Sequence, residues 1–204
     1  MDFDKTRYIP VMEHFYTLQG EGFYTGQAAY FIRLAGCDVG CVWCDVKESW
    51  TVEESQLMLI DDLLNEMSKY PAKLAVITGG EPLMYDLNYL TKKLKHQGYH
   101  IHIETSGAYP LSGALDWICV SPKKFKPVLK EVAIKANELK CIIYNKSDFH
   151  FAEQNKFLTP GGCHLFLQAE WSSREKMIPL MIDYVKQHPQ WKISLQTHKY
   201  LNIP

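Results

Sequence analysis

The sequence has no excess of charge of either sign and no long hydrophobic run. Its 204 residues include 22 Lys or Arg against 23 Asp or Glu, a formal net charge of -1. This balance argues against nucleic acid as the main partner, because nucleic-acid-binding domains usually carry a basic excess. No stretch approaches the ~18 apolar residues of a membrane helix, and residues 1–5 lack the basic-then-apolar pattern of a signal peptide. We therefore expect a soluble, cytoplasmic protein that binds neither nucleic acid nor membrane.

The chain is also too short to hold two full-sized domains. A domain of this length can bury about 70% of the surface that its unfolded chain exposes, so it needs no disulfide to fold. Because no repeat or low-complexity stretch is visible, we expect a single domain over residues 1–204.

Cysteine is present, but it is not spread along the chain as a disulfide framework would be. Three of the six cysteines fall within eight residues, and the other three are scattered. In a chain without an export signal, clustered cysteines more often bind a metal or carry out redox chemistry than form disulfides. The clustered residues are Cys37, Cys41 and Cys44, and the scattered ones, interpreted as buried free cysteines, are Cys119, Cys141 and Cys163.

Short apolar or β-branched runs alternate with helical patterns along the chain. The runs that predict strands are 28–34, 74–78, 99–104, 117–121, 139–144, 164–168 and 191–196. The patterns that predict helices are one that begins with a capping box at 51–54 and continues to 67, then 86–97, 126–137 and 172–187. Such alternation predicts a parallel sheet covered by helices. Roughly seven units fall short of the ~250 residues of a closed eight-fold barrel, so the predicted fold class is α/β, with a partial, open (β/α) barrel.

Polar residues follow several of the predicted strands at the point where each strand ends. Ligand sites in such sheets gather at the carboxyl ends of the strands, so polar residues at five of these ends imply one shared site. The five segments are Cys37–Cys44, Thr78–Pro82, Glu104–Gly107, Ser121–Lys123 and Gln168.

The three clustered cysteines have the spacing C-x3-C-x2-C. A structural zinc ion takes four protein ligands, and neither a fourth cysteine nor a histidine lies close to this segment in the sequence. An iron–sulfur cube usually takes four cysteines. A cube held by three would leave one iron free to bind a substrate or cofactor. A zinc site completed by a distant fourth ligand is the alternative interpretation.

This cysteine spacing, placed after a predicted strand, resembles the signature of the radical S-adenosylmethionine (SAM) superfamily. Trp43 stands where that superfamily has an aromatic residue, and Gly79-Gly80-Glu81-Pro82 resembles its GGEP motif. The resemblance implies a partial barrel of the radical SAM type. It also implies a 4Fe-4S cluster whose open iron binds the amino and carboxylate groups of SAM, and reductive cleavage of the sulfonium to a 5′-deoxyadenosyl radical.

Further segments resemble the 7-carboxy-7-deazaguanine synthase family, which acts in the pathway to queuosine. These segments are Phe15–Gly22, Arg33, Glu104–Gly107, Ser121–Lys123 and Gln196–Pro204. The resemblance implies a radical SAM lyase that converts 6-carboxy-5,6,7,8-tetrahydropterin to 7-carboxy-7-deazaguanine. Ammonia is released in that reaction and SAM is regenerated.

The same resemblance implies roles for individual residues. The cluster ligands are Cys37, Cys41 and Cys44. The substrate contacts are Leu18, Gln19, Gly20, Arg33, Thr78 and Pro204, with His198 nearby. The SAM contacts are Trp43, Asp45, Gly80, Glu81, Ser106, Ser121, Pro122, Lys123 and Gln168. We expect the guanidinium of Arg33 to bind the substrate carboxylate through two hydrogen bonds, and no catalytic side chain is assigned beyond the cluster and SAM.

Magnesium is the implied cofactor for which this sequence departs from the family. Members that use Mg2+ carry Thr or Ser two positions after the last cysteine, where this chain has Val46. Valine offers no oxygen to a hard cation, so we predict a weaker dependence on Mg2+, bound through Asp45, the substrate carboxylate and water. The resemblance also implies a flavodoxin or ferredoxin as reductant and a homodimer.

Two other functions remain open on the sequence alone. An activating enzyme that installs a glycyl radical on a partner protein is also short and uses the same cysteine spacing, but it does not account for Leu18–Gly20 or Pro204. A non-catalytic metal-binding module does not account for the polar strand ends. Iron content separates the last case, because a cubane cluster gives about four irons per chain and a module of this kind gives one zinc.

Overall fold

The computed structural model describes residues 7–204 and contains one sheet of nine strands in the order β3-β1-β2-β4-β5-β6-β7-β8-β9. Neighbouring strands from β2 to β9 pair in parallel, whereas β1 is antiparallel to both β2 and β3. The strands are β1 Tyr8–Leu18, β2 Ala28–Leu34, β3 Leu57–Leu59, β4 Leu74–Gly79, β5 His100–Thr105, β6 Trp117–Val120, β7 Glu138–Ile143, β8 His164–Ala169 and β9 Trp191–Ser194. Within residues 7–204 no pairing joins β9 back to the other end of the sheet. The predicted partial, open barrel is therefore confirmed.

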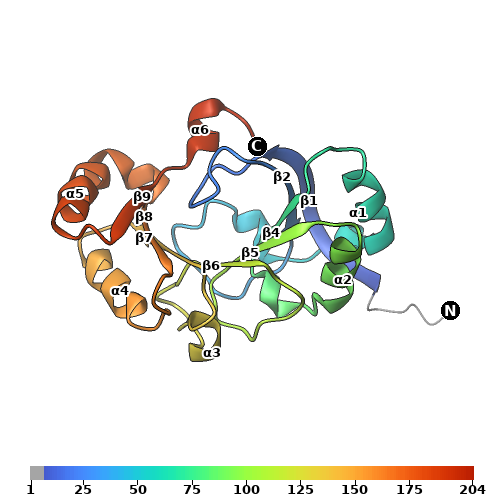
Figure 1. The fold of residues 1–204 in the computed structure, drawn as a ribbon, viewed down its shortest axis with the longest axis horizontal. Helices are drawn as coiled ribbons and strands as arrows, with labels where there is room; N and C mark the ends of the chain where they lie inside the picture. Colours follow the sequence, from blue (N-terminus) through green and yellow to red (C-terminus); the bar gives the residue numbers. More distant parts are fainter. Residues whose placement is uncertain (1–6) are drawn as a thin grey trace.

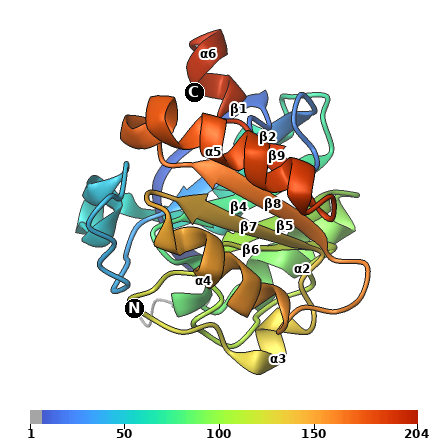
Figure 2. The same ribbon diagram turned by 90° about the vertical axis from the view of Figure 1, so that its left-hand side faces the viewer.

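The helices lie outside the curve of the sheet, except for the last one (Figure 1). They are α1 Ile60–Met67, α2 Asn88–His96, α3 Lys130–Ala133, α4 Ser147–Lys156, α5 Arg174–Gln187 and α6 Thr197–Leu201. Short 3-10 helices occupy Lys47–Trp50, Glu54–Gln56, Pro82–Met84 and Trp171–Ser173. Figure 2 shows α6 and the C-terminus together at one end of the molecule. Across the described range, no helix has the length and apolar character that a membrane crossing requires.

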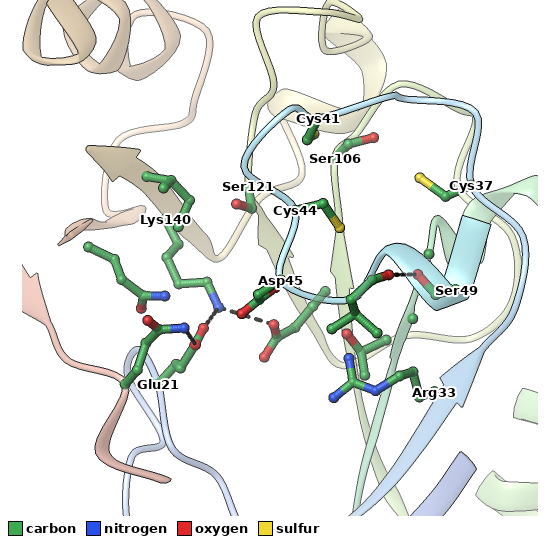
Figure 3. A pocket seen from close by; sticks show the side chains of 18 of the residues that line it. Glu21, Arg33, Cys37, Cys41, Cys44, Asp45, Ser49, Ser106, Ser121 and Lys140 are labelled. Atoms are coloured by element: carbon green, nitrogen blue, oxygen red, sulfur yellow. Dashed lines mark hydrogen bonds and ion pairs between the residues drawn. The ribbon is translucent and has the colours of Figure 1, made fainter. Parts of the chain in front are cut away.

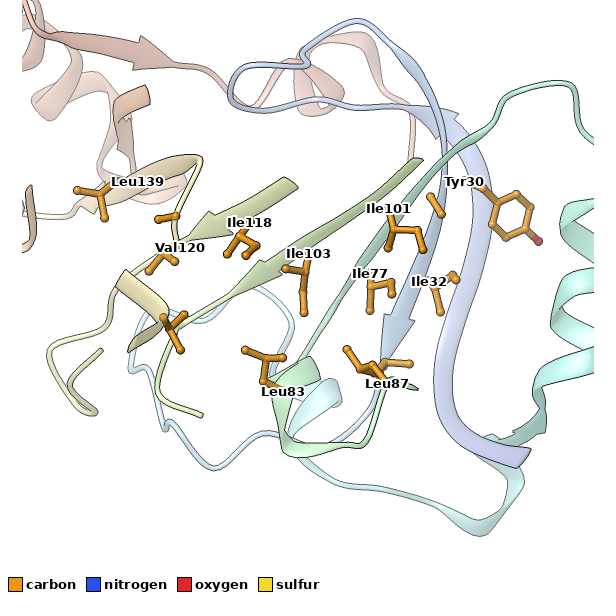
Figure 4. Close-up of a cluster of buried hydrophobic side chains, with 14 of the residues drawn as sticks. Tyr30, Ile32, Ile77, Leu83, Leu87, Ile101, Ile103, Ile118, Val120 and Leu139 are labelled. Atoms are coloured by element: carbon orange, nitrogen blue, oxygen red, sulfur yellow. The ribbon is translucent and has the colours of Figure 1, made fainter. Parts of the chain in front are cut away.

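The two faces of the sheet differ in chemistry. Successive side chains of a strand point to opposite faces. The outer face is apolar and packs against the helices, as Ile77, Ile101 and Ile103 show in Figure 4. On the inner side, Thr78 of β4, Glu104 of β5 and Lys140 of β7 line a cavity. The apolar core therefore lies between sheet and helices, and the inside of the curve is left for polar groups.

The loop 19–27, which joins β1 to β2, packs against β6, β8 and β9. The amide of Gly22 donates to Ser194 Oγ of β9 at 2.9 Å. The ring of Phe23 stacks on Trp117 and packs against His164, with centroids 5.1 and 4.3 Å away. These contacts join the loop, which connects β1 to β2, to β6, β8 and the edge strand β9, so the loop helps to close the partial barrel.

Most of the predicted elements are confirmed, but two helices were predicted wrongly. The helix expected from the capping box at 51–54 begins only at Ile60, because 57–59 form the short strand β3 against β1. The helix expected over 126–137 is reduced to α3, because Lys126 instead bridges back to Lys123 and two prolines precede the helix. Pro179 lies inside α5, which starts at Arg174 rather than 172. The sequence prediction did not include β1, α4 and α6.

Candidate active site

A cavity of about 260 Å³ opens at the carboxyl ends of the parallel strands, on the inner side of the sheet. The predicted segments after β2, β4, β5, β6 and β8 all contribute to its wall, so the expected shared site is formed. All of the predicted cluster, substrate and SAM residues line this cavity except Pro122, which is buried nearby. His198 lines it as well. The structure brings the predicted residues together, and their individual roles remain predictions.

The cysteine-bearing loop is held in place by backbone hydrogen bonds to the loop after β4. The amide of Glu81 donates to Gly36 O at 2.9 Å, and the amide of Gly80 donates to Leu34 O at 2.9 Å. A Cβ on Gly79 would lie 2.2 Å from Leu34 O, and a Cβ on Gly80 would lie 2.2 Å from Gly36 O. The glycine pair is therefore required for this backbone approach, independently of any bound molecule.

Cys37, Cys41 and Cys44 line one wall of the cavity (Figure 3). A turn links the last two, because the amide of Cys44 donates to Cys41 O at 3.1 Å. Among residues 7–204, no three Cys, His, Asp or Glu side chains converge as the ligands of a single metal ion must. Thiolates that each bind a different iron of one cluster need not converge in this way.

Glu81 is used mainly inside the protein. Its carboxylate accepts hydrogen bonds from the amide of Leu83 at 3.1 Å and the amide of Ser106 at 2.8 Å. The hydroxyls of Thr105 and Ser106 also donate to it. The side chain is 1% exposed, so its clearest function is to fix the loop after β4 against the loop after β5. A contact between Glu81 and SAM remains a prediction.

The remaining predicted SAM residues form small groups around the cavity. The Lys123 ammonium donates to Ser121 Oγ at 2.6 Å and lies 5.3 Å from the centre of the Trp43 ring. Gln168 accepts from Ser194 Oγ at 2.7 Å through its carbonyl oxygen, and its side chain also hydrogen-bonds to Glu21 at the cavity wall. The carboxylate of Asp45 forms an ion pair with Lys199 on α6.

On the substrate side, hydrogen bonds within the loop after β1 and from the C-terminal segment hold the backbone of Gln19 and Gly20 in place. The carbonyl of Gln19 accepts from the amide of Gly26 at 2.7 Å. The carbonyl of Gly20 accepts from both the amide and the hydroxyl of Thr197, each at 2.9 Å. Any substrate contact by this backbone is therefore made by a rigid segment. Pro204, the last residue, lines the same cavity.

Arg33 has a partner at the sheet and also lines the cavity. Its Nε lies 2.5 Å from Glu13 Oε1 on the neighbouring strand β1. The ends of the guanidinium are not used in that bond, and Figure 3 shows them directed along the cavity wall. The surface pairing and the predicted carboxylate contact are therefore compatible. Thr78 belongs to the adjacent strand, paired in register with Arg33.

The sequence prediction missed a buried charged network at the base of the cavity. The Lys140 ammonium lies 2.5 Å from Glu21 Oε2 and 3.0 Å from Glu104 Oε2 (Figure 3). Gln19 Nε2 donates to the other oxygen of Glu104, and Gln196 Nε2 to the other oxygen of Glu21. A signal for it exists in the sequence, because Lys140 is a charged residue in the middle of an apolar strand, where an unpaired charge is costly.

Comparisons with known proteins agree with this geometry. Residues 31–139 match the family model of the radical SAM superfamily. The 7-carboxy-7-deazaguanine synthase of Flavobacterium psychrophilum is 55% identical over 201 residues, covering 98% of this chain and 95% of the relative. That of Synechocystis is 47% identical, covering 95% and 93%. The crystal structure of QueE from Escherichia coli superposes with a TM-score of 0.84 at 34% identity, covering 94% of this chain and 95% of that one. The chain therefore belongs to the radical SAM superfamily and, within it, to the 7-carboxy-7-deazaguanine synthase family.

Proposed function

We propose that this protein is a radical SAM lyase that converts 6-carboxy-5,6,7,8-tetrahydropterin to 7-carboxy-7-deazaguanine with release of ammonia. The observation that carries the proposal is one cavity, lined both by three cysteines and by a cation for the substrate carboxylate. The names of the relatives support this activity over the activation of a glycyl-radical partner.

The residues of the chain suit the two molecules that the reaction needs. Cys37, Cys41 and Cys44 would hold the 4Fe-4S cluster. When reduced, such a cluster would supply the electron for reductive cleavage of bound SAM, and the resulting 5′-deoxyadenosyl radical would be the species that abstracts hydrogen from the substrate. The residues of the chain position the reactants and keep water out, which can supply much of the rate enhancement.

The substrate would bind between Arg33 and the charged network below it. The guanidinium of Arg33 complements the substrate carboxylate. Glu21 and Glu104 present carboxylate oxygens, which accept hydrogen bonds from the N–H groups of a pterin ring. The C-terminal segment covers this region, because Thr197 fastens it to Gly20 and Pro204 reaches the cavity.

We propose only a weak dependence of the activity on Mg2+. Val46 lines the cavity at the position where family members that use Mg2+ carry a hydroxyl. The hydroxyl of Ser49 lies near it but donates to Val46 O at 2.7 Å. We therefore propose that Mg2+, where it binds, is held by the substrate carboxylate, Asp45 and water, and that activity depends on it less than in relatives with threonine.

We further propose one domain over residues 1–204, a cytoplasmic homodimer and a flavodoxin or ferredoxin as electron donor. The single continuous sheet supports the first point. Light scattering coupled to gel filtration tests the second, with twice the 23.6 kDa mass of the chain as the expected result. A mass equal to one chain at micromolar concentration would contradict it.

The direct test of the activity is a turnover assay. Anaerobically reconstituted protein, reduced with dithionite, is incubated with SAM and 6-carboxy-5,6,7,8-tetrahydropterin. We expect 7-carboxy-7-deazaguanine and an equal amount of ammonia, with SAM not consumed. Cleavage of SAM without any deazaguanine product, in protein that carries its full iron content, would overturn the proposed substrate.

A further inference from the structure

The inference concerns Lys140, which lies on the inner side of β7 beneath the cavity. Its side chain is 4% exposed. The interior of a parallel strand is ordinarily apolar, and an ammonium there is costly unless it is paired and hydrogen-bonded. The lysine meets this condition by contacting two carboxylates from distant parts of the chain, Glu21 from the loop after β1 and Glu104 from the end of β5.

Glu21 depends largely on the lysine for its charge. Two carboxylates beside one another repel, and without a cation one of them takes up a proton. Burial raises the pKa of Glu21, but the charge and hydrogen bond of Lys140, together with a hydrogen bond from Gln168 and the charge of His198, lower this pKa to about 2. Burial lowers the pKa of Lys140, but the charges of Glu104 and Glu21 hold it well above its usual value.

Other titratable groups surround the three residues but do not replace the lysine. Glu138, two residues earlier on β7, is buried, and burial raises its pKa. Its Oε2 accepts from Trp117 Nε1 at 3.1 Å and points toward the loop 19–27. The groups whose charge acts on this network are Cys119 on β6, Lys123 after β6, Glu138 on β7 and His198 on α6.

Hydrogen bonds also fix the orientation of the two carboxylates. For Glu104, one oxygen accepts from Lys140 and the other from Gln19. For Glu21, one oxygen accepts from Lys140 and the other from Gln196, and the side chain of Gln168 donates a further hydrogen bond to this carboxylate. Each carboxylate oxygen has a second lone pair. Because both side chains line the cavity, the network presents fixed acceptors to whatever binds there.

We propose that Lys140 is a positioning residue for the reaction, whose ammonium pairs with the carboxylates of Glu21 and Glu104 and orients both as acceptors for the ring N–H groups of the bound substrate. The inference rests on the proposed function. Lys140 itself need not touch the substrate, since it acts through the two carboxylates. Its loss is therefore expected to weaken substrate binding and to make that binding depend on pH.

The test compares the wild type with Lys140→Met and Lys140→Gln. We expect KM for the pterin to rise by about tenfold or more in both neutral variants, as for loss of hydrogen bonds to charged groups. We also expect kcat/KM to rise with pH between about 6 and 9 in the variants and to stay level in the wild type, because the buried carboxylate of Glu21 takes up a proton once the ammonium is gone. Calorimetric titration of unreduced protein with the pterin should show the same loss of affinity without turnover.

The controls separate positioning from a merely structural role. Lys192→Met removes an exposed lysine from β9, two strands away in the sheet, and should match the wild type in KM and in pH profile. Lys140→Arg restores the charge and should recover a level pH profile. Circular dichroism and iron content verify that each variant is folded and loaded, and Lys140→Gln keeps a polar group should the methionine variant fail to load.

The outcomes distinguish the two proposals. A wild-type protein that forms no deazaguanine would overturn the proposed function. If the wild type is active and the neutral Lys140 variants lose thermal stability but keep the wild-type KM and pH profile, the lysine is structural and only this inference fails.

Discussion

Gly20 and His198 are packed so closely that a Cβ on the glycine would lie 2.3 Å from Nδ1 of the imidazole and 2.8 Å from its Cβ. This contact joins the loop after β1 to α6, beside the hydrogen bonds from Thr197 to Gly20 O. The C-terminal segment is thereby fixed over the cavity. The absence of a side chain at position 20 is what allows helix and loop to meet.

Gly20→Ala should displace α6 from the loop. The clash involves the Cβ of His198, close to the helix backbone, so rotation of the ring does not relieve it. We expect a loss of about 1–3 kcal/mol in the free energy of unfolding, the usual cost of overpacking, and a clear drop in kcat/KM. Gly161→Ala is the matched control, because no atom lies within 4 Å of its added Cβ. Equal behaviour of the two variants would contradict the contact.

Replacing cysteines should divide them into two classes. Ala in place of Cys37, Cys41 or Cys44 should abolish cluster loading and all turnover, since each thiolate holds one iron. Ala in place of Cys119 or Cys141 should leave about four irons per chain, because these side chains are buried in strands away from the cysteine loop. Colorimetric iron analysis of anaerobic protein decides the matter, and normal iron in Cys44→Ala would refute the assignment.

Arg33→Gln should raise KM for the pterin by about tenfold to a hundredfold, the effect of losing charged hydrogen bonds. Glu13→Gln serves as the comparison, because it removes the partner of Arg33 Nε without removing the cation from the cavity. We expect its KM to change much less. Steady-state kinetics with saturating SAM measure both values, and an equal rise in the two variants would mean that the ion pair itself, rather than the free end of the guanidinium, is what matters.

Val46→Thr tests the proposed weak role of magnesium. A threonine at this position offers a hydroxyl oxygen that Mg2+ can use, which valine does not. We expect removal of Mg2+ by chelation to reduce turnover more in the variant than in the wild type, with recovery on re-addition. A wild type that loses nearly all turnover on chelation and regains it with Mg2+ would contradict the prediction.

His102 should make stability depend on pH. Burial lowers its pKa to about 4, and Nε2 has no partner among the described residues. The unfolded chain, with an ordinary pKa near 6.5, binds more protons between these values, so stability falls as the pH drops below 6.5. His102→Gln should reduce the loss of unfolding free energy between pH 7 and pH 5 by about 2 kcal/mol. Urea unfolding at both pH values measures it. His96→Gln, at an exposed position on α2, should change nothing.

The elements that could be predicted from the sequence are those whose pattern is local. The buried strands β2, β4 and β8 are continuous apolar runs, and the cysteine spacing and the glycine pair are compact motifs. The helix predicted over Lys126–Asn137 was too long, because a helical pattern in the sequence does not reveal that Lys126 pairs back with Lys123. The strand β3 was missed because only its partner β1, more than forty residues away, makes it a strand.

The sequence predicted which motif residues line the cavity, but it did not predict the buried charged network of Lys140. Motif residues such as Gly80 and Ser121 can be recognised one by one, and the cavity does contain them. Lys140 is different, because it belongs to no motif. Its role depends on the ion pair with Glu21, which is 119 positions away in the sequence. Charge pairing across such a distance is a property of the folded sheet, and no local spacing in the chain records it.

The backbone approach at Gly79 and Gly80 sets a limit on how this scaffold can be altered. Because both positions are closed to any side chain by atoms of the chain itself, a library aimed at new substrates gains nothing by randomising them. Every variant with a side chain at Gly79 or Gly80 would misplace the cysteine loop and would therefore be inactive on any substrate. Substitutions are better placed on the side of the cavity away from Gly79 and Gly80, where side chains rather than the main chain form its surface.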